Sequence, residues 1–171
     1  TDLGDALQAA EVLILSIPSQ SLRGVVAELK ERDMRDRTVV LCMKGLEISS
    51  GKRLSEVATE CLDESCSVAV WLGPGHVQEF YKGNPSCMVI DSQNEQIKHR
   101  LVNEFSSDLI RFYYGQDMIG NEIGAAAKNV IGIAAGMLDG KGISSLKGAL
   151  MSRGPNEIAK LIDNRVVGKF L

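Results

Sequence analysis

Short apolar runs alternate with longer mixed stretches over the first two thirds of the chain. Each run is too short for a typical helix and is bounded by Gly, Pro, Ser or charged residues, so it predicts a buried strand. The stretches between the runs repeat apolar residues at helical spacing. Continuous apolar strands separated by helices predict an α/β fold with a mostly parallel sheet covered on both faces. The predicted strands are 12–17, 37–43, 67–72, 86–90 and 109–114, and the predicted helices are 19–29, with Ser19 as the candidate N-cap, 54–62, 76–81 and 95–105.

The pattern changes after Tyr114, where strand signals cease and the chain becomes helical. A long apolar helix is predicted from about Met118, followed by a turn at 139–142 and a helix over 144–153. Gly154 and Pro155 are expected to end that helix, with Pro155 in the first turn of a last one. The sequence therefore predicts one unit over residues 1–115 and an all-helical part over 116–171.

Composition excludes several classes of protein. The 171 residues are 44% hydrophobic and 24% charged, which is enough to bury a sizeable core. A net charge of −3 with few aromatic residues argues against a nucleic-acid partner. The longest apolar stretch is interrupted by Lys128, and neither part is long enough to span a membrane.

The cysteines and histidines predict neither a metal site nor disulfides. None of the four cysteines forms a C-x-x-C pair, and the chain has two histidines. A reducing, cytoplasmic environment is the expectation that follows. The chain opens on Thr1 without a leader-like run, as though cut from something longer.

Lys128 is the most unusual residue of the helical part. Gly124, Lys128, Gly132 and Gly136 recur four positions apart and so form one ridge of a helix with little side-chain bulk. A lysine in such a ridge is expected to sit in a narrow, mostly dry slot, where desolvation would lower its pKa and suit it to proton transfer. The alternative is a lysine that extends to water on a helix whose glycines serve close packing.

Three loops follow the first three predicted strands and would rim one cleft, because ligands gather at the carboxyl ends of parallel strands. They are Pro18-Ser19-Gln20, Lys44-Gly45-Leu46-Glu47 and Gly73-Pro74-Gly75-His76. Lys44 could place an ammonium near a phosphate, and the Gly73 loop offers unblocked amides to an anion. A surface lysine and a plain tight turn are the alternatives for each loop read alone.

Four blocks, taken in order, closely resemble the bacterial NAD(P)-dependent glycerol-3-phosphate dehydrogenases. They are SIPSQ at 16–20, KGLE at 44–47, GPGHVQE at 73–79 and, most specifically, GAAAKNVIGIAAGMLDGKG at 124–142. The resemblance runs from Thr1 to about Ile162. It implies the second half of a Rossmann-like dinucleotide-binding domain, followed by the start of a helical substrate domain. The G-x-G-x-x-G fingerprint does not occur in the chain.

That family interconverts dihydroxyacetone phosphate and sn-glycerol 3-phosphate with NAD or NADP, a source of glycerophospholipid precursors. The resemblance implies that Lys128 is the catalytic proton donor and acceptor, which suits the negative charge that a carbonyl oxygen gains when it accepts hydride. A small phosphorylated substrate is the implied partner, and a homodimer is left open. The implied substrate-binding residues are Lys44, Gly73, Gly75, Lys128 and Asn129, and the implied cofactor-binding residues are Pro18, Ser19, Lys44 and Val77.

The chain also departs from the family pattern. Gly75 stands where relatives often have Ser, Thr or Asn, and the chain stops at Leu171 before a long helical domain. Residues 163–168 (DNRVVG) look like a substrate-binding segment that occurs much later in the family, which makes Asn164 a further candidate. Two rival hypotheses stay open: a lysine-dependent β-hydroxyacid dehydrogenase, and a non-catalytic remnant of the fold.

Overall fold

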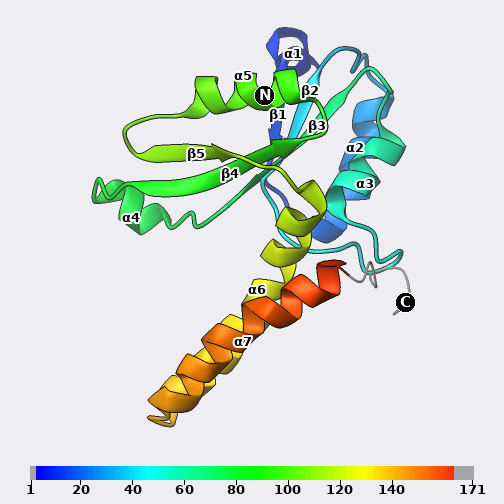
Figure 1. The fold of residues 1–171 in the computed structure, drawn as a ribbon. Coiled ribbons are helices and arrows are strands. Elements are labelled where there is room, and N and C mark those ends of the chain that lie inside the picture. The colour runs from blue at the N-terminus through cyan, green and yellow to red at the C-terminus, as the bar shows by residue number, and fades with distance from the viewer. Residues whose placement is uncertain (1–2, 164–171) are drawn as a thin grey trace.

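The computed structural model describes residues 3–163 as a sheet flanked by helices, from which a helical hairpin projects (Figure 1). The predicted alternation is present, and one short helix that the pattern did not reveal, α1, precedes the first strand. In chain order the elements are α1 (Leu3–Ala9), β1 (Val12–Leu15), the 3-10 turn η1 (Ser19–Ser21), α2 (Leu22–Lys30), β2 (Thr38–Leu41), α3 (Leu54–Cys61), β3 (Ser67–Leu72), α4 (Val77–Tyr81), β4 (Ser86–Ser92), α5 (Glu95–Phe105), β5 (Ile110–Tyr114), α6 (Met118–Gly140) and α7 (Ser144–Asp163).

The five strands lie side by side in the order in which they occur in the chain. Three of the four neighbouring pairs are parallel, which confirms the mostly parallel sheet, whereas β3 and β4 run antiparallel with Val70 opposite Asp91. The connection between them holds only the short helix α4, and it returns the chain along the neighbouring strand instead of crossing over the sheet.

Both faces of the sheet are covered, as predicted. Alternate side chains of β2 point to opposite faces: Val39 and Leu41 pack with α2 and α3, and Val40 packs with α5. Each face thus has its own apolar core. On the face covered by α5, the rings of Trp71 and Phe112 meet edge to face, with 4.7 Å between their centroids.

The first predicted helix begins later than expected, and Ser19 is not its N-cap. Pro18 caps the 3-10 turn, α2 starts at Leu22, and neither cap position makes a side-chain hydrogen bond. The turn follows from Pro18, whose fixed φ of −56° starts a tight bend before the apolar face of α2 reaches the core.

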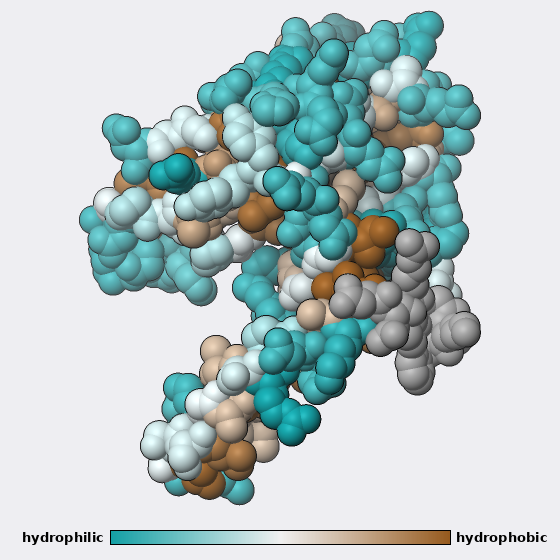
Figure 2. Space-filling view, in the orientation of Figure 1, coloured by the Kyte–Doolittle hydropathy of each residue, from teal (hydrophilic) through white to brown (hydrophobic). Residues whose placement is uncertain are grey.

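The expected break at Gly154 and Pro155 is wrong, because α7 continues through both residues to Asp163. Gly154 is buried against α6, where an added Cβ would lie 2.8 Å from Ile131 Cδ1. Close packing of the two helices therefore holds α7 together across the proline. Apolar residues gather at the far end of the hairpin (Figure 2), where Met137, Leu138, Leu146 and Leu150 help to line a hollow of about 570 Å³.

Candidate active site

The three predicted loops meet at one edge of the sheet. An added Cβ on Gly45 would lie 3.3 Å from Ser19 Oγ, so the first two loops are in contact. The Gln20 side chain fixes them further, because its Nε2 donates to Leu46 O at 2.8 Å and its Oε1 accepts from Ile48 N at 2.9 Å. Residues far apart in sequence are thus brought to the carboxyl ends of β1 and β2.

Lys44 links this edge to the third loop. Its Nζ donates to the carbonyl oxygen of Gly73 at 3.2 Å. The side chain is half-buried, and this burial lowers the pKa of Lys44 below its ordinary value. The positive charge of Lys128 lies close enough to lower the pKa of Lys44 further. Lys44 therefore lies between Gly73 and Lys128 at this edge of the sheet.

Within the Gly73 loop, Gly73 has no room for a side chain and Gly75 has little. Gly73 has a φ of +155°, and an added Cβ would lie 2.8 Å from Met88 Cγ. An added Cβ on Gly75 would lie 3.2 Å from Met88 Cε. Met88 therefore fills the space on the Cβ side of both glycines, and neither glycine offers a side-chain contact of its own.

The prediction that Lys128 sits in a dry slot is wrong for the residues that the structure describes, because the side chains of Lys128 and Asn129 are both exposed. Added Cβ atoms on Gly124, Gly132 and Gly136 would meet no described atom within 4 Å. The reason is the orientation of α6: it packs against α7 through another face, which includes Ile131, and leaves the glycine ridge open.

Lys44 and Lys128 carry their charges without an acidic partner in the part of the chain that the structure describes. Within residues 3–163, no carboxylate forms a salt bridge with Lys44 or Lys128. Two neighbouring cations of this kind attract an anion, and a lysine ammonium can also place a proton on a developing oxyanion. Two such ammonium groups are suited to holding a small anion.

A buried cluster that sequence reasoning missed attaches α6 to the start of α3. Glu122 is 5% exposed, and its carboxylate accepts hydrogen bonds from Arg53 Nη1 at 2.7 Å, Ser55 N at 2.9 Å and Ser55 Oγ at 2.5 Å. Its only sequence signal is a single acidic residue within the apolar stretch 118–138. Lys128 lies on the same helix, six positions further on.

A second buried carboxylate, also missed, holds α6 to the sheet. Asp91 accepts from Asn121 Nδ2 at 2.7 Å, and Lys98 Nζ lies 3.7 Å from Asp91 Oδ1. Lys98 also donates to the carbonyl oxygen of Gly115 at 2.7 Å. An added Cβ on Gly115 would lie 2.3 Å from Asp91 Cγ, so only glycine fits there.

The remaining predicted residues take different places. Val77 begins α4 beside the glycine loop and is 59% exposed, and Pro18 opens the turn that carries Ser19. Asn164 lies outside the described residues. No residue in the described range 3–163 belongs to a group of three or more His, Cys, Asp or Glu side chains that could hold a metal ion.

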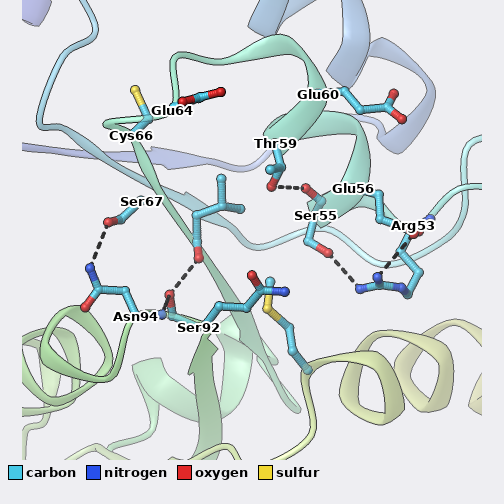
Figure 3. A pocket seen from close by; sticks show the side chains of 13 residues that line it. Arg53, Ser55, Glu56, Thr59, Glu60, Glu64, Cys66, Ser67, Ser92 and Asn94 are labelled. Atoms are coloured by element: carbon cyan, nitrogen blue, oxygen red, sulfur yellow. Dashed lines mark hydrogen bonds and ion pairs between the residues drawn. The ribbon is translucent and has the colours of Figure 1, made fainter.

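Neither Lys44 nor Lys128 lines the pocket beside α3. It measures about 700 Å³ and lies between α3 and the β3 and β4 strands (Figure 3). Several of its polar side chains are bonded to neighbours: Asn94 Nδ2 donates to Ser67 Oγ at 3.3 Å, and Ser92 Oγ donates to Val68 O at 2.7 Å.

Comparison with known proteins decides the family. The chain matches the description "NAD-dependent glycerol-3-phosphate dehydrogenase N-terminus" over residues 1–98 and "NAD-dependent glycerol-3-phosphate dehydrogenase C-terminus" over residues 117–168. The chain belongs to the NAD-dependent glycerol-3-phosphate dehydrogenase family. The resemblance read from its four sequence blocks is therefore confirmed.

Members of this family from bacteria align with most of the chain. It is 36% identical over 164 residues to a glycerol-3-phosphate dehydrogenase (NAD(P)+) of Chlorobium limicola, an alignment that covers 94% of this chain and 49% of the relative. It is 38% identical over 162 residues to the one of Fusobacterium nucleatum, with 94% and 48% covered. The chain thus spans about half the length of the curated relatives it matches.

Solved structures of the family share the fold. The glycerol-3-phosphate dehydrogenase of Coxiella burnetii aligns with a TM-score of 0.86 at 28% identity, covering 95% of this chain and 50% of that one. The enzyme of Plasmodium falciparum aligns with a TM-score of 0.83 at 23% identity, covering 92% and 45%. These alignments confirm the predicted Rossmann-like fold class. None of the helices formed by the described residues is both long and apolar enough to cross a membrane.

Proposed function

We propose that this chain carries the two-lysine part of an active site that interconverts dihydroxyacetone phosphate and sn-glycerol 3-phosphate with NAD or NADP. The observation that carries the proposal is the meeting of Lys44, Gly73 and Lys128 at the carboxyl edge of the sheet, with no carboxylate among the described residues to neutralise the lysines. Membership of the dehydrogenase family supports the same function.

The chemistry assigns Lys128 the proton transfer. As hydride adds to the carbonyl carbon of dihydroxyacetone phosphate, the electron pair of the C=O bond moves to the oxygen. The Lys128 ammonium stabilises that charge and donates a proton to it, which leaves a neutral amine to be reprotonated from water. Lys44 and Asn129 bind the substrate, and Gly73 and Gly75 contribute backbone groups to the binding loop. The reverse reaction uses Lys128 as the base.

The residues present fit one flank of a dinucleotide. When bound, NAD or NADP supplies or accepts the hydride. Pro18 and Ser19 lie on the loop after β1, and exposed Val77 offers an apolar surface beside the glycine loop. Gly73 could not carry a side chain without meeting Met88, so a larger residue there would displace this loop. Together with Lys44, these residues would hold the part of the cofactor near the substrate.

Further parts of the proposal follow from the family. The two family regions support the unit boundary near residue 116, because the N-terminal region ends at residue 98 and the C-terminal region begins at residue 117. A cytoplasmic location and a small phosphorylated substrate fit a dehydrogenase of this kind. A homodimer stays open. The β-hydroxyacid dehydrogenase and the non-catalytic remnant are not favoured by the family match.

The deciding experiment is oxidation of NADH or NADPH in the presence of dihydroxyacetone phosphate. Lys128→Met should lose turnover by about 100-fold or more, because general acid catalysis contributes on this scale. Lys30→Met serves as the control, since Lys30 lies at the end of α2 on the surface. Activity on 3-hydroxyacids instead would select the first rival. Turnover retained by Lys128→Met would remove this residue from its role.

A further inference from the structure

The loop that carries Lys44 is closed on itself and ends at the start of α3. Leu46 pairs with Arg53 in an isolated antiparallel bridge, and Glu47 N donates to Lys52 O at 2.9 Å. Arg23 also holds this loop through two hydrogen bonds to Glu47, at 2.8 and 2.7 Å. Because the backbone is tied in this way, the position of Arg53 is coupled to that of Lys44.

Arg53 in turn binds the buried Glu122 on α6, so the loop that carries Lys44 is linked to that helix. Both carboxylate oxygens are used: Oε1 accepts from Ser55 N, and Oε2 accepts from Arg53 Nη1 and Ser55 Oγ. Figure 3 shows Arg53 and Ser55 projecting from the start of α3 on the side where a helix in the colour of α6 lies. The positive end of the α3 dipole adds to this attraction.

Such an arrangement is better suited to fixing geometry than to adding stability. Burying two charges costs about as much as their attraction returns, so a buried pair is weak evidence for a stabilising role. Its directional hydrogen bonds, however, allow one arrangement of α6 against α3. Lys128 follows Glu122 by roughly 9 Å along the helix axis, which is close enough for the anchor to set its position.

We propose that Glu122, with Arg53 and Ser55, is a positioning residue that fixes α6 against the 44–53 loop so that the Lys44 and Lys128 ammonium groups lie side by side. The proposal rests on the proposed function for its catalytic meaning. The geometric part stands on the contacts alone, and it is tested without any turnover.

The first test is the titration of Lys44 in Glu122→Gln, followed by NMR of its labelled Cε. Loss of the anchor should move Lys128 away and shift the Lys44 midpoint upward, as Lys128→Met does by deleting the neighbouring charge. Loss of the Glu122 charge alone would shift the midpoint downward, because a carboxylate favours the charged form of a nearby lysine. The direction of the shift therefore separates the two effects.

Two variants complete this test. Glu104→Gln removes a carboxylate from an exposed pair with Arg100 on α5 and should leave the Lys44 midpoint unchanged. Ser55→Ala keeps every charge and removes the two hydrogen bonds of Ser55 Oγ, one donated to Glu122 and one accepted from Arg53, but leaves the ion pair and the bond from Ser55 N. It should therefore give a smaller upward shift even if Glu122→Gln does not fold. A folded Glu122→Gln or Ser55→Ala with an unchanged or lowered midpoint would overturn the proposal.

Turnover provides the second readout. With dihydroxyacetone phosphate and NADH or NADPH, Glu122→Gln should lower kcat by up to about 100-fold, the cost of a displacement near 1 Å at a reacting group. An unchanged kcat in the folded variant would count against the positioning role. If the wild-type protein turns over no dihydroxyacetone phosphate, the proposed function fails while the Lys44 titration still decides the geometry.

Discussion

Gly73 is constrained both by its backbone and by its surroundings. Its φ of +155° is strained for a residue with a side chain, and Met88 occupies the space that a Cβ would need. Its carbonyl oxygen also accepts the hydrogen bond from Lys44. The same residue thus shapes the loop and orients one of the two lysines.

Gly73→Ala is expected to destabilise the protein by roughly 2–4 kcal/mol, since backbone strain and the contact with Met88 act together. The matched control is Gly83→Ala, at a glycine with φ of +76° and nothing within 4 Å of an added Cβ. Strain alone should cost that variant about 1 kcal/mol. Denaturant unfolding measures both, and equal losses would show that Met88 does not restrict the loop.

Glu47 predicts a dependence of stability on pH. Its hydrogen bonds from Arg23 and Ser50 lower its pKa from 4.5 to about 2. A carboxyl with a lowered folded-state pKa stabilises the fold above its unfolded pKa, and this stabilisation is lost as pH falls from about 4.5 through 2. Glu47→Gln should therefore flatten the fall in unfolding free energy over this range. The same slope in both proteins, measured by urea unfolding, would contradict the assignment.

The sequence indicated the two candidate site lysines, but not the buried carboxylates that anchor helix α6. Lys44 and Lys128 stood out because they follow a strand and interrupt an apolar helix. Glu122 and Asp91 gave almost no signal, because a buried carboxylate is recognised by the donors around it, and those donors come from α3 and α6, far away in the sequence. For Lys128 the pattern left two readings open, a dry slot and a side chain that extends to water, because a helical ridge does not record what faces it. The structure agrees with the second reading.

At the scale of the elements, α7 shows packing overriding a local break signal. Pro155 lacks an N–H and would ordinarily interrupt a helix. Gly154 allows α7 to approach Ile131 on α6, and the contact holds the helix on both sides of the proline. Gly154 of this helix packs closely against α6 and Gly148 does not, so substitutions at the two glycines test whether close packing holds the helix.

Gly148→Ala and Gly154→Ala should change stability in opposite directions. An added Cβ on Gly148 meets nothing within 4 Å, so the substitution should stabilise the helix by about 1 kcal/mol. An added Cβ on Gly154 would lie 2.8 Å from Ile131 Cδ1, and overpacking of this kind costs about 1–3 kcal/mol. Thermal unfolding followed by circular dichroism measures both. A stabilising Gly154→Ala would mean that the two helices are not held by close packing.

The elements themselves were largely predictable, because short apolar runs and helical periodicity are local properties. Strand β3 and helix α5 have the predicted bounds, and β4 and β5 are close to theirs. The antiparallel β4 was not predicted, since the pattern of one strand does not record the direction of its neighbour. Helix α1 was missed because its seven residues, which bury only Leu7, are too few to show a clear period.

For the molecule as a whole, the open pair of lysines has a thermodynamic consequence. A ligand that binds only the folded protein raises its stability in proportion to the logarithm of its concentration. Lys44 and Lys128 have no carboxylate partner within residues 3–163, so a small phosphorylated anion should bind there even without a dinucleotide. Binding at this edge would connect the sheet to helix α6.

Glycerol 3-phosphate should therefore raise the melting temperature. At ten times its dissociation constant it would add about 1.4 kcal/mol, which corresponds to roughly 3–5 °C. The shift should disappear in Lys44→Met and Lys128→Met but persist in Lys30→Met, because only the first two remove a cation from the site. Sodium chloride at the same ionic strength separates specific binding from general screening. A shift that survives loss of both site lysines would place anion binding elsewhere on the molecule.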